Sequence, residues 1–268
     1  MKTTGIPPPL ISAIVLAFLW QSCPSDGRPL TIGGNTTGDS FDPISGGNYS
    51  EMRSRLTADF AGTSFTSLPS LTSSLAGFDL IVLTRFHSLD ISAAEQIAIR
   101  NYVLNGGNLL YVGEAIGGIS NDTFTLPFGI GMAPDPSTNV SLALATYSNI
   151  GHPFLTGPFG VPQNPPSGSF AAQITITGPS VEMARWNGGG IAISAFDRNT
   201  LGPGAGFGIF LTDVNMMTPG RYSSEVGPMV SNALTVPEPS AVMCLALGAL
   251  ICLGRRRSAD CLTLKSYT

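Results

Sequence analysis

Two short apolar runs with a helical pattern between them dominate the middle of the chain. Residues 78–84 form a β-branched, apolar run that predicts a buried strand. Residues 93–104 carry apolar side chains at helical spacing, with a start signal at 88–90 and a glycine stop at 105–107. A second apolar run follows at 108–113. Strand, helix, glycine turn and strand predict a right-handed crossover between parallel strands.

The same patterning predicts elements on both sides of this unit. Upstream, a helix at 49–60, capped by Asn48 or Ser50, lies between strands at 30–33 and 63–68. The proline-rich stretch 122–169 reads as loops with short strands. Farther on, the pattern predicts four strands and a last helix, at 171–177, 181–186, 190–196, 207–213 and 223–234. The expected fold class is α/β, a three-layer sandwich with a mostly parallel sheet.

Each end of the chain carries an apolar run whose flanking residues are typical of a targeting segment. Lys2 followed by an apolar run at 10–20 has the order of a secretory signal, and at about 1.5 Å per residue the run is too short to span a bilayer. Near the other end, a proline-rich break precedes an apolar run at 241–253 and three arginines. We therefore expect a signal helix within residues 1–27 and a C-terminal membrane-anchor helix with the arginines on the cytoplasmic side.

The C-terminal order closely resembles the PEP-CTERM sorting signal of exported bacterial proteins. The resemblance implies export, an exosortase partner that processes the chain near the proline motif, and a cell that makes exopolysaccharide. It also implies a protein either anchored in the cell-envelope membrane or released to the extracellular matrix. Two features depart from the usual signal: the apolar run is short for a stable span, and the chain continues past the arginines. The motif residues are Pro237, Glu238, Pro239, Arg255, Arg256 and Arg257.

This organisation divides the chain into four parts: a signal peptide at 1–27, a domain at 28–235, the sorting signal with its transmembrane helix at 236–257, and a cytoplasmic tail at 258–268. All four cysteines lie outside the domain, so neither a disulfide nor a cysteine nucleophile is available within it. The domain carries eight arginines, no lysine and fourteen acidic residues. This acidic balance does not favour a nucleic-acid partner.

The domain is similar to class I glutamine-amidotransferase-like domains, including uncharacterised branches found in exported bacterial proteins. The segments that carry the resemblance are 77–83, 96–110, 112–117, 152–153 and 188–194. It implies an amidotransferase-like, flavodoxin-like sheet, with a cysteine nucleophile on the turn after the second crossover strand. Glu114 stands at that place, and a carboxylate there cannot form the usual thioester. The resemblance thus implies the fold and argues against the reaction.

Glu114, His87 and His152 remain weak candidates for catalysis. Glu114 could be a general base, a metal ligand or a carboxylate that fixes a loop. His87 follows a strand between Arg85 and Asp90, and His152 precedes a proline. Two histidines with Glu114 or Asp213 could hold a metal, but their spacing fits no known ligand pattern, so we expect no metal and no cofactor. Otherwise both histidines fix loops.

Familiar nucleotide and esterase motifs are missing. Residues 33–40 resemble a phosphate-binding loop, but Asp39 occupies the lysine position and would repel phosphate. Residues 202–208 lack dinucleotide spacing, and no Gly-x-Ser-x-Gly elbow occurs. Three hypotheses remain: an exported, non-catalytic binding domain for a glycan or an envelope protein; a secreted hydrolase acting on carbohydrate or peptide through Glu114 and a histidine; and a structural component of a biofilm matrix.

Overall fold

The structure, a computed structural model, describes residues 28–84, 91–114, 122–134 and 142–236. The expected signal helix, the sorting motif and the expected membrane anchor lie outside these ranges. Within the described ranges, none of the helices combines the length and the apolarity that crossing a bilayer requires.

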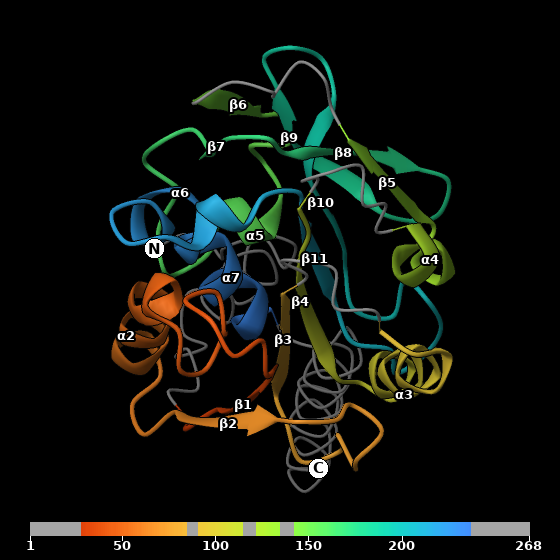
Figure 1. Ribbon diagram of the computed structural model, residues 1–268. Coiled ribbons are helices and arrows are strands. Elements are labelled where there is room, and N and C mark those ends of the chain that lie inside the picture. The colour runs from red at the N-terminus through yellow and green to blue at the C-terminus, as the bar shows by residue number, and fades with distance from the viewer. Residues whose placement is uncertain (1–27, 85–90, 115–121, 135–141, 237–268) are drawn as a thin grey trace, which may run out of the picture.

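One sheet runs through the molecule, in the order β2-β1-β3-β4-β11-β10-β9-β6-β7, with β8 joined to β10 and β5 to β8 (Figure 1). The strands are β1 (Thr31–Asn35), β2 (Ser64–Leu68), β3 (Leu80–Thr84), β4 (Asn108–Val112), β5 (Ile130–Pro134), β6 (Ala143–Tyr147), β7 (Ser167–Gly168), β8 (Ala172–Ile176), β9 (Val181–Trp186), β10 (Ile191–Phe196) and β11 (Gly208–Leu211). The helices are α2 (Ser50–Asp59), α3 (Ala93–Leu104), α4 (Asp122–Thr125), α5 (Pro153–Thr156), α6 (Tyr222–Glu225) and α7 (Gly227–Thr235), and the 3-10 helices are η1 (Gly47–Tyr49), η3 (Leu126–Phe128) and η5 (Val214–Met217).

The sheet is mixed rather than mostly parallel. The five strands β2, β1, β3, β4 and β11 pair in parallel, as expected for the first half of the chain. The pairs that involve β5 to β10 are antiparallel, including the pair that joins β10 to β11. The expectation of a mostly parallel sheet therefore fails for the second half, because short hairpin-like connections there leave no room for crossover helices. The mixed α/β class is confirmed.

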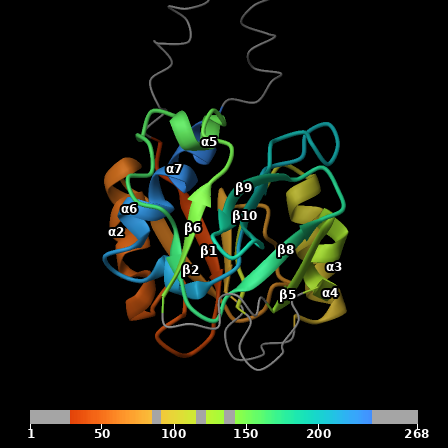
Figure 2. The ribbon, with the colours of Figure 1, turned by 90° about the horizontal axis from the view of Figure 1, so that it is seen from above.

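Helices cover both faces of the parallel strands (Figure 2). Alternate residues of β3 supply the two faces: Leu80 and Val82 pack with α2, α5, α6 and α7, while Ile81 and Leu83 pack with α3, α4 and η3. Strands that are buried on both faces have near-continuous apolar sequences, which is the pattern that predicted them.

The central crossover β3-α3-β4 is confirmed, with β3 and β4 parallel. Its helix covers the expected residues, Ala93–Leu104, while the expected start signal at 88–90 lies outside the described residues. Ser92 is the N-cap: its side chain accepts a hydrogen bond from the backbone N–H of Glu95, whose carboxylate accepts one from the backbone N–H of Ser92. This reciprocal capping box satisfies two N–H groups that the helix leaves without partners. The helix ends at Asn105, before Gly106 with its left-handed φ of 98°.

Two of the three glycines in the segment 33–40, which resembles a phosphate-binding loop, belong to a strand. Gly33 and Gly34 lie inside β1, where a Cβ on Gly33 would come within 2.8 Å of Ile81 and Leu68 side-chain atoms. The glycines therefore permit close packing of β1 rather than an approach to phosphate. The expected cap of the next helix was wrong: Tyr49 is the N-cap of α2, without a side-chain cap bond, because η1 leads into the helix.

Candidate functional site

Four polar residues end the neighbouring parallel strands β1, β3, β4 and β11. Asn35 and Thr84 are the last residues of β1 and β3, and Glu114 and Asp213 follow β4 and β11 by two residues. We call this the carboxyl edge of the sheet. Ligands of open α/β sheets bind outside the carboxyl ends of the strands, so this edge is the first place to look for a site.

Glu114 is buried at the centre of this edge. Leu211 pairs with Val112, and the Gly113 N–H donates to the Leu211 carbonyl at 2.8 Å, which continues the ladder past the ends of β4 and β11. The same register brings the backbones of Glu114 and Asp213 to neighbouring positions, about 4.8 Å apart between strands. Two carboxylates thus lie at the same edge, as the sequence allowed.

Asn35 and Thr84 are engaged with one another. The Asn35 amide donates to the Thr84 carbonyl and accepts from the Thr84 N–H, each at 2.9 Å. The Thr84 hydroxyl hydrogen-bonds to the buried Tyr49 hydroxyl. Burial raises the pKa of Tyr49 well above its ordinary value, so this phenol stays protonated. These side chains fasten the ends of β1 and β3 together.

Asp213 and a second buried acid, Glu225, hold the segment 167–169. Asp213 caps η5 by accepting from the Asn215 N–H at 2.6 Å and also accepts from the Ser169 N–H. Glu225 accepts from the backbone N–H and the hydroxyl of Ser167, at 2.9 and 2.6 Å. Burial raises the pKa of Asp213 to about 6 and raises the pKa of Glu225 above its ordinary value.

Phe170 follows this held segment in an unusual conformation. Its φ is 55°, and half of the residue (50%) is exposed. The residues around it are bonded to the end of β11: Ser169 to Asp213, and Ala172 through its N–H to the Thr212 carbonyl at 3.0 Å. A bulky residue in left-handed conformation costs free energy, and such outliers cluster at functional sites. Phe170 is therefore an exposed aromatic residue in a segment whose backbone is bonded to the carboxyl edge.

His152 lies at the opposite edge. It caps α5 by accepting at Nδ1 from the Phe154 N–H at 3.3 Å, and its Nε2 lies 3.4 Å from an Asp197 carboxylate oxygen. Asp197 follows β10 where Phe196 pairs with Gly208, the first residue of β11. Five residues of extended chain, roughly 16 Å, separate Gly208 from Asp213. The structure therefore does not bring His152 to Glu114 or Asp213.

The other expected partners lie outside the described residues. Arg85, His87 and Asp90 fall in the range 85–90, which the structure does not describe. Among the residues that it does describe, no three His, Cys, Asp or Glu side chains gather as a metal site would require. The Glu114 and His87 pairing stays a prediction.

The sequence analysis missed the residues that tie this edge together. Asn35, Thr84, Ser167 and Glu225 carried no motif. A usable signal did exist for two of them, because Asn35 and Thr84 are polar residues that end apolar strands. Ser167 and Glu225 are 58 positions apart and meet only through the tertiary fold.

The comparisons with known proteins concern two parts of the chain. The PEP-CTERM protein-sorting motif matches residues 235–258, so the sorting signal recognised from the sequence is confirmed. This motif is recognised by exosortase and implies export and sorting to the cell envelope. No curated protein matches the chain.

Solved structures resemble the domain. The mmIFT52 N-terminal domain superposes with a TM-score of 0.57 at 17% identity, covering 77% of this chain and 98% of that one. A cytoplasmic protein from Salmonella typhimurium gives 0.50 at 14% identity, covering 76% and 97%. A glutamine amidotransferase from Thermotoga maritima gives 0.48 at 10% identity, covering 69% and 75%. At these identities the likeness concerns the fold alone.

Proposed function

We propose that this protein is an envelope-displayed binding protein: exported, sorted by an exosortase, and carrying a non-catalytic domain at 28–235 that binds its partner at the carboxyl edge. The partner class that we favour is an exopolysaccharide. Before sorting, the apolar run at 241–253 would hold the chain in the membrane, with Arg255 to Arg257 on the cytoplasmic side.

The observation that carries this proposal is the place where the chain leaves the domain. Ser231, one turn before the end of α7, bonds to Asp59 at the end of α2, and α2 ends next to the starts of β1 and β2. The chain thus leaves at the amino edge of the sheet, opposite Glu114 and Asp213. A domain held through the sorting signal would present its carboxyl edge away from the membrane, toward polymers and proteins outside.

The carboxyl edge suits binding better than amide hydrolysis. A buried glutamate stands where the resemblance expects the nucleophile, and it cannot form a thioester. Asn35, Thr84 and Asp213 are bonded to backbone groups of their own fold. Phe170 offers an exposed ring on which the C–H face of a sugar could pack, and its strained backbone supports a role beyond packing.

Sorting is tested by changing the motif in the full chain. A variant with Pro237→Ala, Glu238→Ala and Pro239→Ala should remain in the inner-membrane fraction of cells that contain the exosortase, while the wild type moves outward. The chain supplies a matched control, because Pro134, Asp135, Pro136 and Ser137 repeat the Pro-acid-Pro-Ser order inside the domain. Asp135→Asn should sort like the wild type and Glu238→Gln more slowly. Equal sorting of the triple variant and the wild type would refute this part of the proposal.

Binding is tested with polysaccharide from the producing cells. The purified protein should be retained on immobilised exopolysaccharide, and Phe170→Ala should lower that retention at least threefold. Leu126→Ala is the control, since Leu126 is similarly exposed (53%) but lies on η3 and not on the segment that Asp213 holds. Retention that does not respond to Phe170→Ala would contradict a ligand at the carboxyl edge. Ammonia release from glutamine above that of Glu114→Gln would contradict the absence of catalysis.

A further inference from the structure

The sorting signal begins inside the last packed helix of the domain. The motif match starts at Thr235, which is also the last residue of α7. Val236 still packs against the core, and its N–H donates to the Asn232 carbonyl at 3.2 Å. Pro237 is the next residue, so no linker separates the packed chain from the residues that the exosortase recognises.

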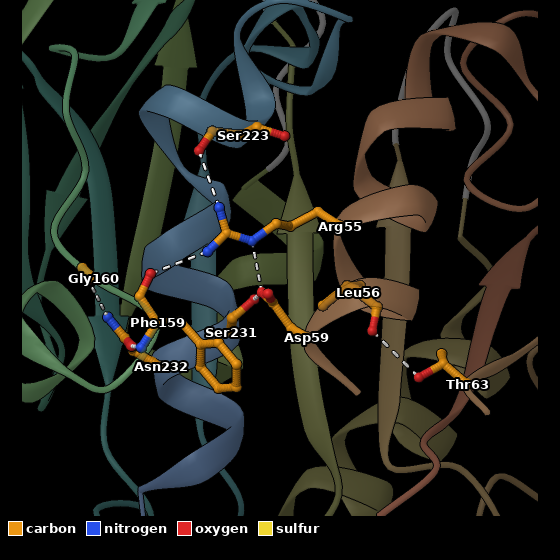
Figure 3. Close-up of polar contacts among 9 residues, drawn as sticks. All are labelled: Arg55, Leu56, Asp59, Thr63, Phe159, Gly160, Ser223, Ser231 and Asn232. Atoms are coloured by element: carbon orange, nitrogen blue, oxygen red, sulfur yellow. Dashed lines mark hydrogen bonds and ion pairs between the residues drawn. The ribbon is translucent and has the colours of Figure 1, made fainter. Parts of the chain in front are cut away.

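The last turns of α7 are fastened to α2 by a hydrogen-bonded ion pair (Figure 3). The Ser231 hydroxyl donates to the Asp59 carboxylate at 2.6 Å, and the same oxygen accepts from Arg55 Nε at 2.6 Å. The Arg55 guanidinium donates in turn to the Phe159 carbonyl at 3.0 Å. The Asp59 carboxylate therefore joins α7 to α2, and Arg55 extends the attachment to the loop that follows α5.

Asn232 adds a second attachment from the next position of the helix (Figure 3). Its side-chain oxygen accepts from the Phe159 N–H at 2.8 Å, and its amide donates to the carbonyls of Phe154 and Gly160 at 3.0 and 2.9 Å. The side chain is fully buried, and a Cβ on Gly157 would come within 2.6 Å of it. We call Arg55, Asp59, Ser231 and Asn232 the α7 latch.

The latch limits how far the end of the helix can unwind. Beyond Asn232 the chain is held by weaker means: the packing of Ala233 and Val236, and a hydrogen bond from the Thr235 hydroxyl to the Asn232 carbonyl at 2.8 Å. Unwinding residues 233–236 would lengthen this stretch from about 6 Å as helix to about 14 Å as extended chain. Unwinding farther would break the latch itself, whose buried groups lose their partners.

We propose that the α7 latch gates sorting: the exosortase gains full access to Pro237–Pro239 only when the end of α7 unwinds, and the latch opposes this step. The gate rests on the sorting half of the proposed function. Physically, an enzyme cleft that grips an extended peptide needs chain on both sides of the recognised residues. Here the upstream side is packed helix. The folded domain therefore slows its own sorting.

The decisive experiment inserts a flexible spacer in the full chain. Six Gly and Ser residues between Val236 and Pro237 supply extended chain without unwinding α7, so the sorting rate in a pulse-chase should rise at least threefold. The same insertion after Gly189, an exposed glycine with open space around it on the turn between β9 and β10, should leave the rate unchanged. An unchanged or slower rate with the spacer at Val236 would overturn the gate. A slower rate would mean that the domain surface itself is recognised.

A substitution that weakens the latch tests the unwinding of α7 without inserting residues. Ser231→Ala should raise the sorting rate about twofold in the full chain and add nothing when the spacer is present. Thr63→Val is the matched control: it removes the side-chain hydrogen bonds to the carbonyls of Phe60 (2.5 Å) and Leu56 (3.4 Å, Figure 3) at the end of α2, and neither bond involves α7. If Thr63→Val raises the rate equally, general destabilisation explains the effect and the gate is wrong.

The two proposals fail in different ways. If the triple variant of Pro237, Glu238 and Pro239 sorts like the wild type, the sorting half of the proposed function is wrong. If that variant is retained while the spacer has no effect, sorting stands and only the gate is wrong.

Discussion

At the amino edge of the sheet, Asn232 alone bonds to three backbone groups of the segment 154–160, whereas at the carboxyl edge the polar contacts are spread over the ends of β1 and β3 and the residues after β11. The amino-edge contacts involve a neutral amide and one partly buried ion pair. The carboxyl edge buries acids, two of which, Asp213 and Glu225, have raised pKa values because of desolvation. The difference indicates that the amino edge is built to hold the last helix, while the carboxyl edge retains groups that respond to pH.

The largest effect should come from removing the amino-edge amide. Asn232→Ala leaves the Phe159 N–H and the carbonyls of Phe154 and Gly160 without this partner, so we expect a loss of about 3 kcal/mol in the free energy of unfolding. Urea denaturation of the purified protein measures it. Asn101→Ala, on the exposed face of α3, should change stability by less than about 0.5 kcal/mol. If Asn232→Ala lowers the free energy of unfolding only slightly, the amino edge is not the more firmly held of the two edges.

A smaller loss is expected where the carboxyl edge is most tightly packed. A Cβ on Gly168 would lie 2.1 Å from an Asp213 carboxylate oxygen and 2.9 Å from the Trp186 ring. Gly168→Ala should therefore cost about 2 kcal/mol, the usual scale of overpacking. Gly151→Ala, which has open space around it, should be nearly neutral in the same denaturation experiment. If both substitutions are neutral, the segment 167–169 is not held as described.

The smallest effect should follow pH. The pKa of Asp213 is raised from 3.8 to about 6 on folding, so between these values the folded state binds more protons than the unfolded state. Stability should then rise as the pH falls from 7 to 5, by about 1 kcal/mol from this group, with Glu225 acting in the same direction. Urea denaturation at both pH values measures the change.

The control for this pH effect is Asp213→Asn, which should weaken the protein and reduce the rise in its stability between pH 7 and 5 to the part that Glu225 contributes. Acids with lowered pKa values, such as Asp42 and Glu95, lose their stabilising contribution only at lower pH. If the free energy of unfolding decreases when the pH is lowered from 7 to 5, the raised pKa values of the buried acids at the carboxyl edge are contradicted.

Much of the fold could be predicted from local pattern. Residues 78–84, 93–104 and 108–113 form β3, α3 and β4 nearly as expected, because each carries its own periodicity and stop signal. The second half was harder. Its strands were placed well along the chain, but their antiparallel partners depend on contacts between distant segments, such as β5 with β8.

The candidate site, too, was predictable where it depends on local pattern and not where it depends on contacts between distant segments. Glu114 and Asp213 reached one edge because parallel strands put their carboxyl ends on the same side of a sheet, which the order of elements already implies. His152 did not join them, since its loop packs beside the start of β11 instead of its end. Neither the burial of Asp213 nor the left-handed backbone of Phe170 leaves a trace in the sequence.

The sequence by itself determined the sorting signal, the core strands and the absence of a cysteine nucleophile, because each is a property of contiguous residues or of composition. Only the tertiary structure decided that α7 is latched by Asp59 and Asn232, and that the chain leaves opposite Glu114. Ser231 and Asp59 are 172 positions apart, and only the packing of α7 against α2 brings their oxygen atoms within hydrogen-bonding distance.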